Sequence, residues 1–221
     1  ADSILEPINF GFTDSLVRYQ NLRKKFPAIE IMIGIGNITE LTHADTAGMN
    51  AILFGIASEL DINYALCTQV SEHCNKAIIE GNFARRIMHT TKQYNMPPKD
   101  ISNKLLSLHE RKPFPYSTEE LKEMWSNVKD KNYRIYVNSE GIHVFNKKSF
   151  YTEKDATEMY QHLDVKNDDG HAYYLGMELA KAQIAFQLGK RYDQDEMLKW
   201  GCSVDVSDED IMKFKTAGHT M

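Results

Sequence analysis

The segment that most constrains the fold spans residues 30–50 and reads EIMIGIGNITELTHADTAGMN. Its apolar run, residues 31–33, ends in the glycine-containing stretch 34–37 and is followed at once by polar side chains. A short continuous apolar run of this kind is typical of a buried parallel strand. Because α/β proteins bind ligands at the carboxyl ends of such strands, the segment predicts an α/β fold with a ligand site in this loop. An ordinary loop with a helix cap is the alternative.

The composition argues against several classes of protein. With 221 residues and 42% hydrophobic content, the chain has room for one large domain or two smaller ones. Its formal net charge of −5 argues against a nucleic-acid groove or a polybasic membrane patch. No apolar run approaches the ~20 residues that a membrane span needs, and the start of the chain has no signal-peptide pattern. We therefore expect a cytoplasmic protein that binds neither nucleic acid nor membrane.

The three cysteines predict reduced thiols rather than a disulfide framework. Cys67, Cys74 and Cys202 lack the CxxC spacing. Cys67 and Cys74 could share a metal with His73, but packing is the commoner role of such cysteines. We therefore predict no metal site.

The first ninety residues read as repeated βα units. The expected strands are residues 3–5, 30–33 and 63–68. The expected helices begin at a cap on Thr13 or Asp14, at residue 50 (running to 60), and at residue 72 after a Ser71 cap (running towards 92). Three parallel strands cannot enclose a core by themselves. Together with a start at Ala-Asp-Ser that leads directly into a strand, this suggests the C-terminal part of a longer or split protein.

The rest of the chain changes character at Pro97-Pro98. We expect a linker over residues 93–131 with short helices at 100–109 and 118–128, the second capped by Ser117 or Thr118. The domain boundaries are thus 1–92, 93–131, 132–202 and an acidic tail at 203–221.

Residues 132–202 predict a small α+β domain. Alternating apolar residues at 133–137 and 142–145 flank a short turn with glycine, the pattern of a β-hairpin. A long helix is expected over residues 171–188, ended by Gly189. The tail beyond it is acidic and poor in large apolar residues, so we expect it to be mobile or to lie on a partner.

Three segments carry a resemblance to a known superfamily: ILEPINFGF (4–12), IMIGIGNIT (31–39) and YALCTQVSEH (64–73). They resemble the last three βα units of the pterin-binding (β/α)8 barrels, which include dihydropteroate synthase and the methyl-tetrahydropterin methyltransferases that act on corrinoid proteins. The resemblance implies that residues 1–92 are the C-terminal part of such a barrel, followed by a smaller α+β domain.

Individual positions place the chain within that superfamily. Glu6 stands where the synthases have the aspartate that holds the pterin ring, and Asn37 matches an asparagine that contacts the pterin near N5 in the methyltransferases. At the positions where the synthases have a functional lysine, arginine and histidine, this sequence has Ile38, Leu66 and Thr68. Losing these groups removes charge stabilisation for a diphosphate leaving group. The resemblance therefore favours methyl transfer over dihydropteroate synthesis.

Residues 171–201 extend the resemblance over nearly the whole chain. This segment resembles the fused C-terminal domain of dihydropteroate synthase-related proteins found near tetrahydromethanopterin metabolism. It is also similar to a segment of proteins related to one of the subunits of tetrahydromethanopterin S-methyltransferase. The resemblance thus implies a class of ligand more than a particular reaction.

The candidate pterin-binding residues follow from the strand ends: Glu6, Gly34, Gly36, Asn37, Asp45, Asn50 and Gln69, with Asn37 as the candidate catalytic residue. Asp45 has a helix cap as its alternative role. Glu40 could act as an acid or base, although a solvated loop residue is the simpler interpretation. His171 could be a metal or corrinoid ligand, but local packing on Tyr174 is favoured.

The function expected is that of a pterin-dependent transferase. It would bind a reduced pterin, a tetrahydromethanopterin or tetrahydrofolate derivative, and take part in one-carbon (methyl) transfer. One alternative is a transferase that joins a pterin diphosphate to an arylamine; another is a non-catalytic subunit that binds a pterin or a corrinoid protein. The expected partners are the N-terminal half of the barrel, in the same or a separate chain, a second copy, and a corrinoid protein.

Overall fold

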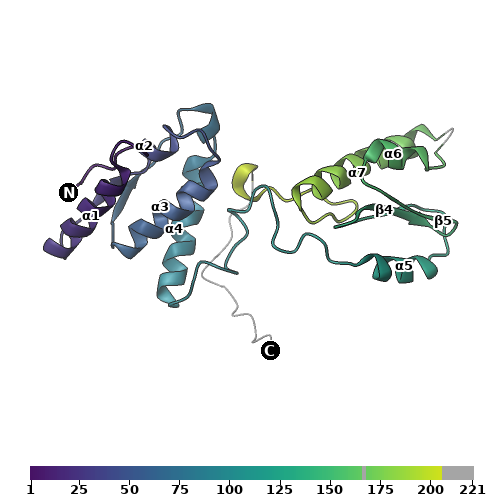
Figure 1. Cartoon of the computed structure of the whole chain (residues 1–221), viewed down its shortest axis with the longest axis horizontal. Coiled ribbons are helices and arrows are strands. Elements are labelled where there is room, and N and C mark those ends of the chain that lie inside the picture. Colours follow the sequence, from purple (N-terminus) through teal and green to yellow (C-terminus); the bar gives the residue numbers. More distant parts are fainter. Residues whose placement is uncertain (166–167, 206–221) are drawn as a thin grey trace. The chain divides into compact units, whose positions relative to one another are not determined.

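The computed structural model describes residues 1–165 and 168–205. The chain divides into two compact units: unit 1 comprises Ala1–Ser107 and the chain from Gly201 onward, and unit 2 comprises Leu108–Trp200 (Figure 1). Within the described residues, no helix combines the length and the apolar character needed to cross a membrane. Both units mix helices and strands, so an α/β composition is confirmed.

Unit 1 is built on a short parallel sheet. Strand β1 (Met32–Gly34) pairs in parallel with β2 (Tyr64–Leu66), and an isolated parallel bridge joins Asp2 to Met32. The helices of this unit are α1 (Phe12–Lys25), α2 (Gly36–Thr39), α3 (Thr46–Glu59), α4 (Ala77–Gln93) and the short 3-10 helices η1 (Glu72–Cys74) and η2 (Gly201–Ser203).

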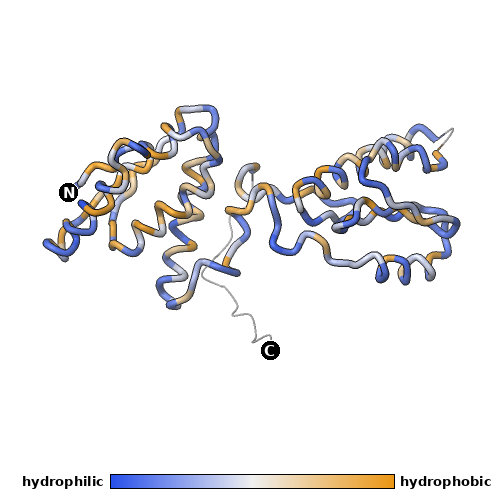
Figure 2. The backbone as a smooth tube through the Cα atoms, viewed as in Figure 1, coloured by the Kyte–Doolittle hydropathy of each residue, from blue (hydrophilic) through white to orange (hydrophobic). Residues whose placement is uncertain are grey.

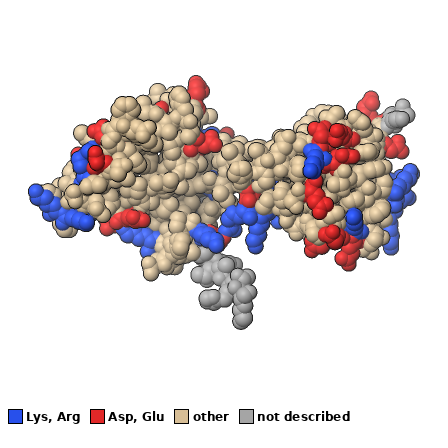
Figure 3. All heavy atoms as spheres, viewed as in Figure 1, with Lys and Arg blue, Asp and Glu red and all other residues tan. Residues whose placement is uncertain are grey.

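The core of unit 1 is apolar and lies under β1. Ile31 and Ile33 are completely buried and pack with Leu5, Tyr19 and Leu53. Helix α3 carries mostly apolar residues, coloured orange in Figure 2, and packs against α4. On the face drawn in Figure 3, acidic and basic side chains of both units are interspersed.

The predicted strand at residues 3–5 is wrong. Among the described residues, residues 3–5 make no sheet pairing, and the nearest is the isolated bridge between Asp2 and Met32. Ile4 adopts a left-handed conformation with φ of 58°, which interrupts an extended chain. The predicted caps on Thr13 and Asp14 are wrong as well. Helix α1 begins earlier, after Gly11, whose φ of 111° turns the chain into the helix without a side-chain cap.

Two further helix boundaries and one predicted helix differ from the structure. Helix α3 begins at Thr46, so Asn50 lies inside it rather than at its head. Ser71 does not cap α4: it precedes η1, and α4 begins only at Ala77. The helix predicted at 100–109 is absent, since this stretch forms turns and irregular chain.

Unit 2 contains an antiparallel sheet in the order β3 (Arg134–Asn138), β4 (Gly141–Asn146), β5 (Ser149–Glu153). The predicted hairpin is confirmed by β3 and β4. Strand β5 and helix α6 (Ala156–Gln161) were not predicted.

The two helices predicted for this part of the chain are confirmed. Helix α5 (Thr118–Ser126) begins with a capping box, in which Ser117 and Glu120 each bond the other's backbone N–H. Helix α7 (Asp169–Leu188) ends at Gly189 in the left-handed conformation. Residues 206–221, most of the predicted tail, lie outside the described residues.

Candidate functional site

Asn37 joins the carboxyl end of β1 to the N-terminal segment around Leu5. This residue lies in α2, and its Nδ2 atom donates a hydrogen bond to the carbonyl oxygen of Leu5 at 2.8 Å. The side chain is exposed, so its Oδ1 atom remains accessible from solvent. Since Glu6 directly follows Leu5, this bond holds the first two candidate residues, Glu6 and Asn37, at the same end of the sheet.

Glu6 is half-buried and held at its backbone. Its N–H donates to the Ser15 hydroxyl at 2.9 Å, and Ser15 in turn donates to the Gly11 carbonyl. The carboxylate oxygen Oε1 lies 3.7 Å from the Arg18 guanidinium. Both side chains of this ion pair are exposed enough that the pair is weak. The carboxylate therefore remains available to a ligand.

Glu40 connects the loop after β1 to the loop after β2. Its two carboxylate oxygens accept hydrogen bonds from the backbone N–H groups of Val70 and Ser71, each at 2.8 Å. These bonds lower the pKa of Glu40 to about 2. A carboxylate fixed in this way is a structural anchor rather than a free base. Gln69, the residue before the anchored pair, is exposed in the same loop.

Gly36 permits the close approach of Thr68. A Cβ atom on Gly36 would stand 2.5 Å from the Thr68 hydroxyl oxygen, so only glycine fits without a shift. That hydroxyl is buried, and its hydrogen bonding to the Glu40 carboxylate contributes to the lowered pKa of Glu40. Gly34 is different, since a Cβ there would meet nothing within 4 Å.

His73 and Cys74 are used structurally. His73 Nε2 lies 2.9 Å from the Thr39 carbonyl oxygen, and the Cys74 thiol donates to the same oxygen at 3.2 Å. The ring of His43 contacts that of His73 edge to face, with centroids 5.1 Å apart. Within residues 1–165 and 168–205, no group of three or more His, Cys, Asp or Glu side chains is placed to hold a metal ion.

Two candidate residues lie apart from the joined loops. Asp45 occupies the N-cap position of α3 without making a side-chain cap bond, and it is exposed. Asn50 is fully buried between α3 and α4, where its Nδ2 atom donates to the Ala77 carbonyl and lies 3.3 Å from Glu80 Oε2. The structure therefore brings together Glu6, Gly36, Asn37 and Gln69 but not Asn50.

His171 belongs to unit 2 and is packed between aromatic rings. Its ring centroid lies 6.2 Å from that of Tyr174 and 6.3 Å from that of Tyr133. Its backbone N–H donates to Asp168 Oδ1 at 2.9 Å, which caps α7. This arrangement is the local packing that the sequence favoured.

Sequence reasoning missed the anchoring role of Glu40 and the close packing of Thr68 on Gly36. Neither had a local signal, because Glu40 bonds residues some thirty positions further along the chain. A hollow of about 280 Å³ lies at the start of α1, lined by Ile8, Asn9 and residues 11–14, and none of the candidate pterin-binding residues lines it. This volume is below the range of about 300–1,000 Å³ for a ligand pocket.

Comparison with known proteins points to pterin binding as the function class. The family described as PterinBD-DUF4346 matches residues 120–195, all within unit 2. The name of this family supports a pterin-binding domain, whereas the strand-end residues described above lie in unit 1.

One similar protein is the uncharacterized protein MJ0107 of Methanocaldococcus jannaschii. It is 29% identical over 221 residues, a match that covers 88% of this chain and 41% of that protein. The chain therefore spans less than half the length of this relative. No solved structure matches the chain.

Proposed function

We propose that this chain binds a reduced pterin, of the tetrahydromethanopterin or tetrahydrofolate type, and takes part in one-carbon transfer. The observation that carries the proposal is the Asn37–Leu5 hydrogen bond, which fixes Asn37 beside Glu6 at the carboxyl end of the sheet. Ligands of open α/β sheets bind at this end. The match to a family named for pterin binding supports the same class of ligand.

The roles of the residues follow from their chemistry. The carboxylate of Glu6 would accept hydrogen bonds from the amide and amino edge of a pterin ring, as charge-assisted bonds of this kind are strong. One N–H of the Asn37 side-chain amide donates to the Leu5 carbonyl, which leaves Oδ1 and the second N–H for the ligand. A hydrogen bond from Asn37 near N5 would stabilise the change of charge there during transfer. The Gly34 and Gly36 backbones and Gln69 would line the same site, with Asp45 at its margin.

The charges of the loops favour methyl transfer over diphosphate release. The loops at residues 6–12, 34–45 and 67–73 contain no lysine or arginine. A diphosphate leaving group needs positive charge in the transition state. A transferase that joins a pterin diphosphate to an arylamine would have Arg18 beside Glu6 and would have to take further cations from other polypeptide.

The proposal includes a second contributor of polypeptide. The nearby hollow of about 280 Å³ is too small to enclose a pterin and is not lined by Glu6 or Asn37, so the walls around these two residues would come from the other half of a barrel, in the same or a separate chain. A corrinoid protein is the proposed methyl donor or acceptor. A non-catalytic pterin-binding subunit is the remaining alternative and would bind without turnover.

Isothermal titration calorimetry tests the proposal. The titrated protein is the longest natural polypeptide that contains this chain, and the ligands are methyl-tetrahydrofolate and methyl-tetrahydromethanopterin. We expect Glu6→Gln and Asn37→Ala each to weaken binding by about 1–3 kcal/mol, the cost of leaving a buried polar partner unpaired. Glu59→Gln is the matched control, since it removes an exposed carboxylate at the C-terminal end of α3, away from these loops, and should leave binding unchanged. Absence of pterin binding, or equal effects of all three variants, would refute the proposed site.

A second measurement separates the reactions. Adding a pterin diphosphate and an arylamine should release no diphosphate if the chain serves methyl transfer. Release of diphosphate in step with condensation would favour the biosynthetic alternative.

A further inference from the structure

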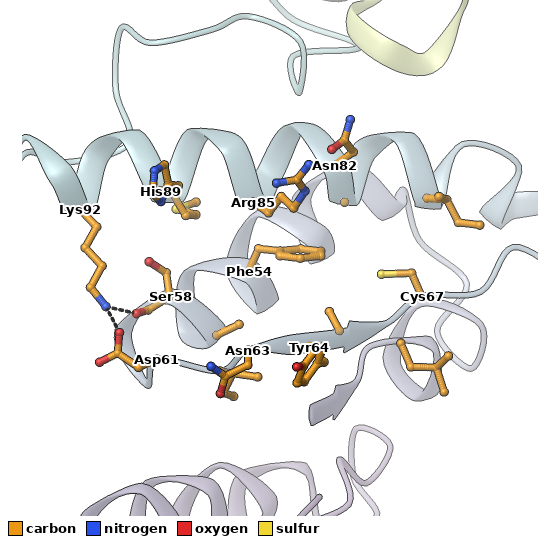
Figure 4. A pocket seen from close by; sticks show the side chains of 17 residues that line it. Phe54, Ser58, Asp61, Asn63, Tyr64, Cys67, Asn82, Arg85, His89 and Lys92 are labelled. Atoms are coloured by element: carbon orange, nitrogen blue, oxygen red, sulfur yellow. Dashed lines mark hydrogen bonds and ion pairs between the residues drawn. The ribbon is translucent and has the colours of Figure 1, made fainter. Parts of the chain in front are cut away.

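The largest hollow of unit 1 leaves apolar surface uncovered along β2. It has a volume of about 790 Å³ and is lined by residues of α3, β2 and α4. In Figure 4, α4 runs along one wall, β2 along the other, and Phe54 of α3 lies between them. The other half of a barrel, which is part of the proposed function, would cover this surface. Unit 2 exposes apolar surface as well, and a barrel does not account for it.

Helix α7 of unit 2 carries this exposed apolar surface. Tyr173, Met177 and Ile184 are 73%, 51% and 37% exposed, and Ala180 between them is exposed as well. Their spacing of four, three and four residues places the four side chains in a row along one side of the helix. We call these four residues the α7 stripe.

The composition of α7 is that of a helix buried on all sides. Between residues 170 and 188, the only Asp, Glu, Lys or Arg side chains are Glu178 and Lys181, which pair with each other at 2.5 Å. The side opposite the stripe packs into the core of unit 2, for example through Leu175 and Leu179. A helix that is apolar all round is normally covered all round. In this chain, only one side of α7 is covered.

Gly176 is a second sign that something packs on this side. It is exposed next to Met177, and a Cβ atom there would meet nothing within 4 Å. Glycine in the interior of a helix is destabilising relative to alanine, so the fold of the single chain gains nothing from it. The absence of a side chain does allow the backbone of another helix to approach closely.

We propose that the α7 stripe is the contact between two copies of this chain, with their α7 helices packed antiparallel. In a two-fold symmetric contact the same surface meets itself, so it must be complementary to its own copy. A stripe without charge meets this condition, because it produces no like-charge repulsion. The antiparallel arrangement also places Tyr173 opposite Ile184 and Met177 opposite Ala180, so that each larger side chain meets a smaller one.

The charges at the ends of α7 give the pair its direction. Asp168 and Asp169 are exposed at the start of the helix. Arg191 follows its end and is 43% exposed, although it is paired with Asp193. Parallel helices would bring the aspartates of both copies together, whereas antiparallel helices bring them near Arg191 of the other copy. The inference rests on α7 alone, and it holds whether or not the chain binds a pterin.

The contact is small, so the dimer should be weak. The stripe extends over about 16 Å of helix, at about 1.5 Å per residue. One helix pair of this length lies at the low end of specific interfaces, below about 1,200 Å². We therefore expect a reversible dimer that dissociates on dilution.

Sedimentation velocity of the full chain tests the inference. The weight-average sedimentation coefficient should rise between about 5 and 500 μM, as a weak dimer forms. Ile184→Glu should weaken association by about tenfold or more, since it places a charge in an apolar contact. Ile52→Glu is the matched control, because Ile52 is an exposed isoleucine on α3 of unit 1, and it should leave association unchanged. Ala180→Glu, at an exposed position, keeps the test informative if Ile184→Glu fails to fold.

Gly176→Gln separates association from stability. Glutamine favours helices more than glycine does, and its side chain has open space in the single chain. At a concentration where the chain is monomeric, this variant should raise the urea midpoint of unit 2. It should nevertheless weaken the dimer by about tenfold, because the added side chain holds the two helices apart. A glycine that is merely exposed would give the first effect without the second.

Mixed disulfides test the direction. Chains with Tyr173→Cys are mixed with chains that carry Ile184→Cys, and the mixture is oxidised gently. Antiparallel helices should link the two different variants, whereas parallel helices would link like with like. The unaltered chain is the control for its own thiols, of which Cys74 and Cys202 are completely buried.

Three outcomes would overturn the inference. The chain stays monomeric over the whole concentration range; a dimer forms that survives both glutamates on α7 or is dissociated by Ile52→Glu; or disulfides between like variants predominate. Dissociation by Ile52→Glu would assign the contact to unit 1 instead.

Discussion

The backbone of Gly36 lies directly under the hydroxyl of Thr68, so closely that a methyl group on Gly36 would stand 2.5 Å from that oxygen. The contact joins the first turn after β1 to the loop after β2. It makes the packing of two loops depend on the absence of one side chain.

Gly36→Ala should therefore destabilise unit 1 by about 1–3 kcal/mol, the usual cost of overpacking. Thr68→Ala in the same chain should recover most of the loss, because it removes the clashing oxygen. Thermal unfolding followed by far-UV circular dichroism measures both. If the double variant is no more stable than Gly36→Ala alone, the contact is not the cause.

The Glu40 carboxylate should make the loop after β2 sensitive to acid. Its pKa is lowered from an ordinary 4.5 to about 2 by hydrogen bonds from Val70 and Ser71. A carboxyl whose pKa is lower in the folded state stabilises the loop above pH 4.5, and this stabilisation is lost as the pH falls towards 2. Hydrogen exchange of the Val70 and Ser71 amides should accelerate over this interval beyond its intrinsic pH dependence. Glu40→Gln should exchange faster at neutral pH, whereas Glu72→Gln should behave as the unaltered chain.

Unit 2 should lose stability in mild acid through His143. This residue is fully buried in β4, with its ring nitrogens bonded to Thr152 and Asn138, and burial lowers its pKa. A histidine whose pKa is lower in the folded state stabilises the fold above its unfolded value of about 6.5, and the contribution is lost as the pH falls below that value. Both tryptophans, Trp125 and Trp200, lie in unit 2, so their fluorescence during urea unfolding follows this unit alone.

When urea unfolding is measured at a series of pH values, His143→Gln should reduce the fall in the free energy of unfolding between pH 7 and pH 5. His89→Gln, a substitution in unit 1, should leave the curve unchanged. An equal slope with and without His143 would assign the acid sensitivity to other groups.

Lys190 should hold together the two ends of unit 2. Its side chain is completely buried, Nζ donates to the Leu108 carbonyl at 3.2 Å, and the ammonium lies 4.6 Å from the centre of the Trp200 ring. Lys190→Ala should cost about 2–4 kcal/mol, since it opens a cavity and removes the hydrogen bond to the Leu108 carbonyl. Lys190→Met keeps the volume and should cost less. Urea unfolding of unit 2, monitored by the fluorescence of Trp125 and Trp200, ranks the two variants; a larger loss for methionine would contradict this account.

The sequence predicted elements whose signals are local. Ser117 with Glu120 three residues later, and Gly189 after a long apolar helix, marked real helix ends because each signal acts within one turn. The alternating residues on either side of Gly141 likewise marked the hairpin. Asn37 and Glu6 were singled out through the resemblance to pterin-binding barrels, and the Asn37–Leu5 hydrogen bond joins the two segments that carry them.

Features that depend on distant contacts were not predictable. Ile4 is of a residue type that favours strands, yet its left-handed conformation prevents the predicted strand at residues 3–5 from forming. Asn50 was placed in the site because its helix was expected to begin there, whereas α3 starts four residues earlier and turns this side chain towards Glu80. Nothing near Glu40 in the sequence announces that it bonds Val70 and Ser71.

Unit 2 interrupts unit 1 in the sequence, and this has a consequence in time. Cys202 is completely buried in unit 1 with Phe83 and Ile87, and its N–H donates to the Lys104 carbonyl at 2.7 Å. During synthesis, all of unit 2 leaves the ribosome before Cys202 does. Unit 2 can therefore fold while unit 1, although made first, still lacks a piece of its own core.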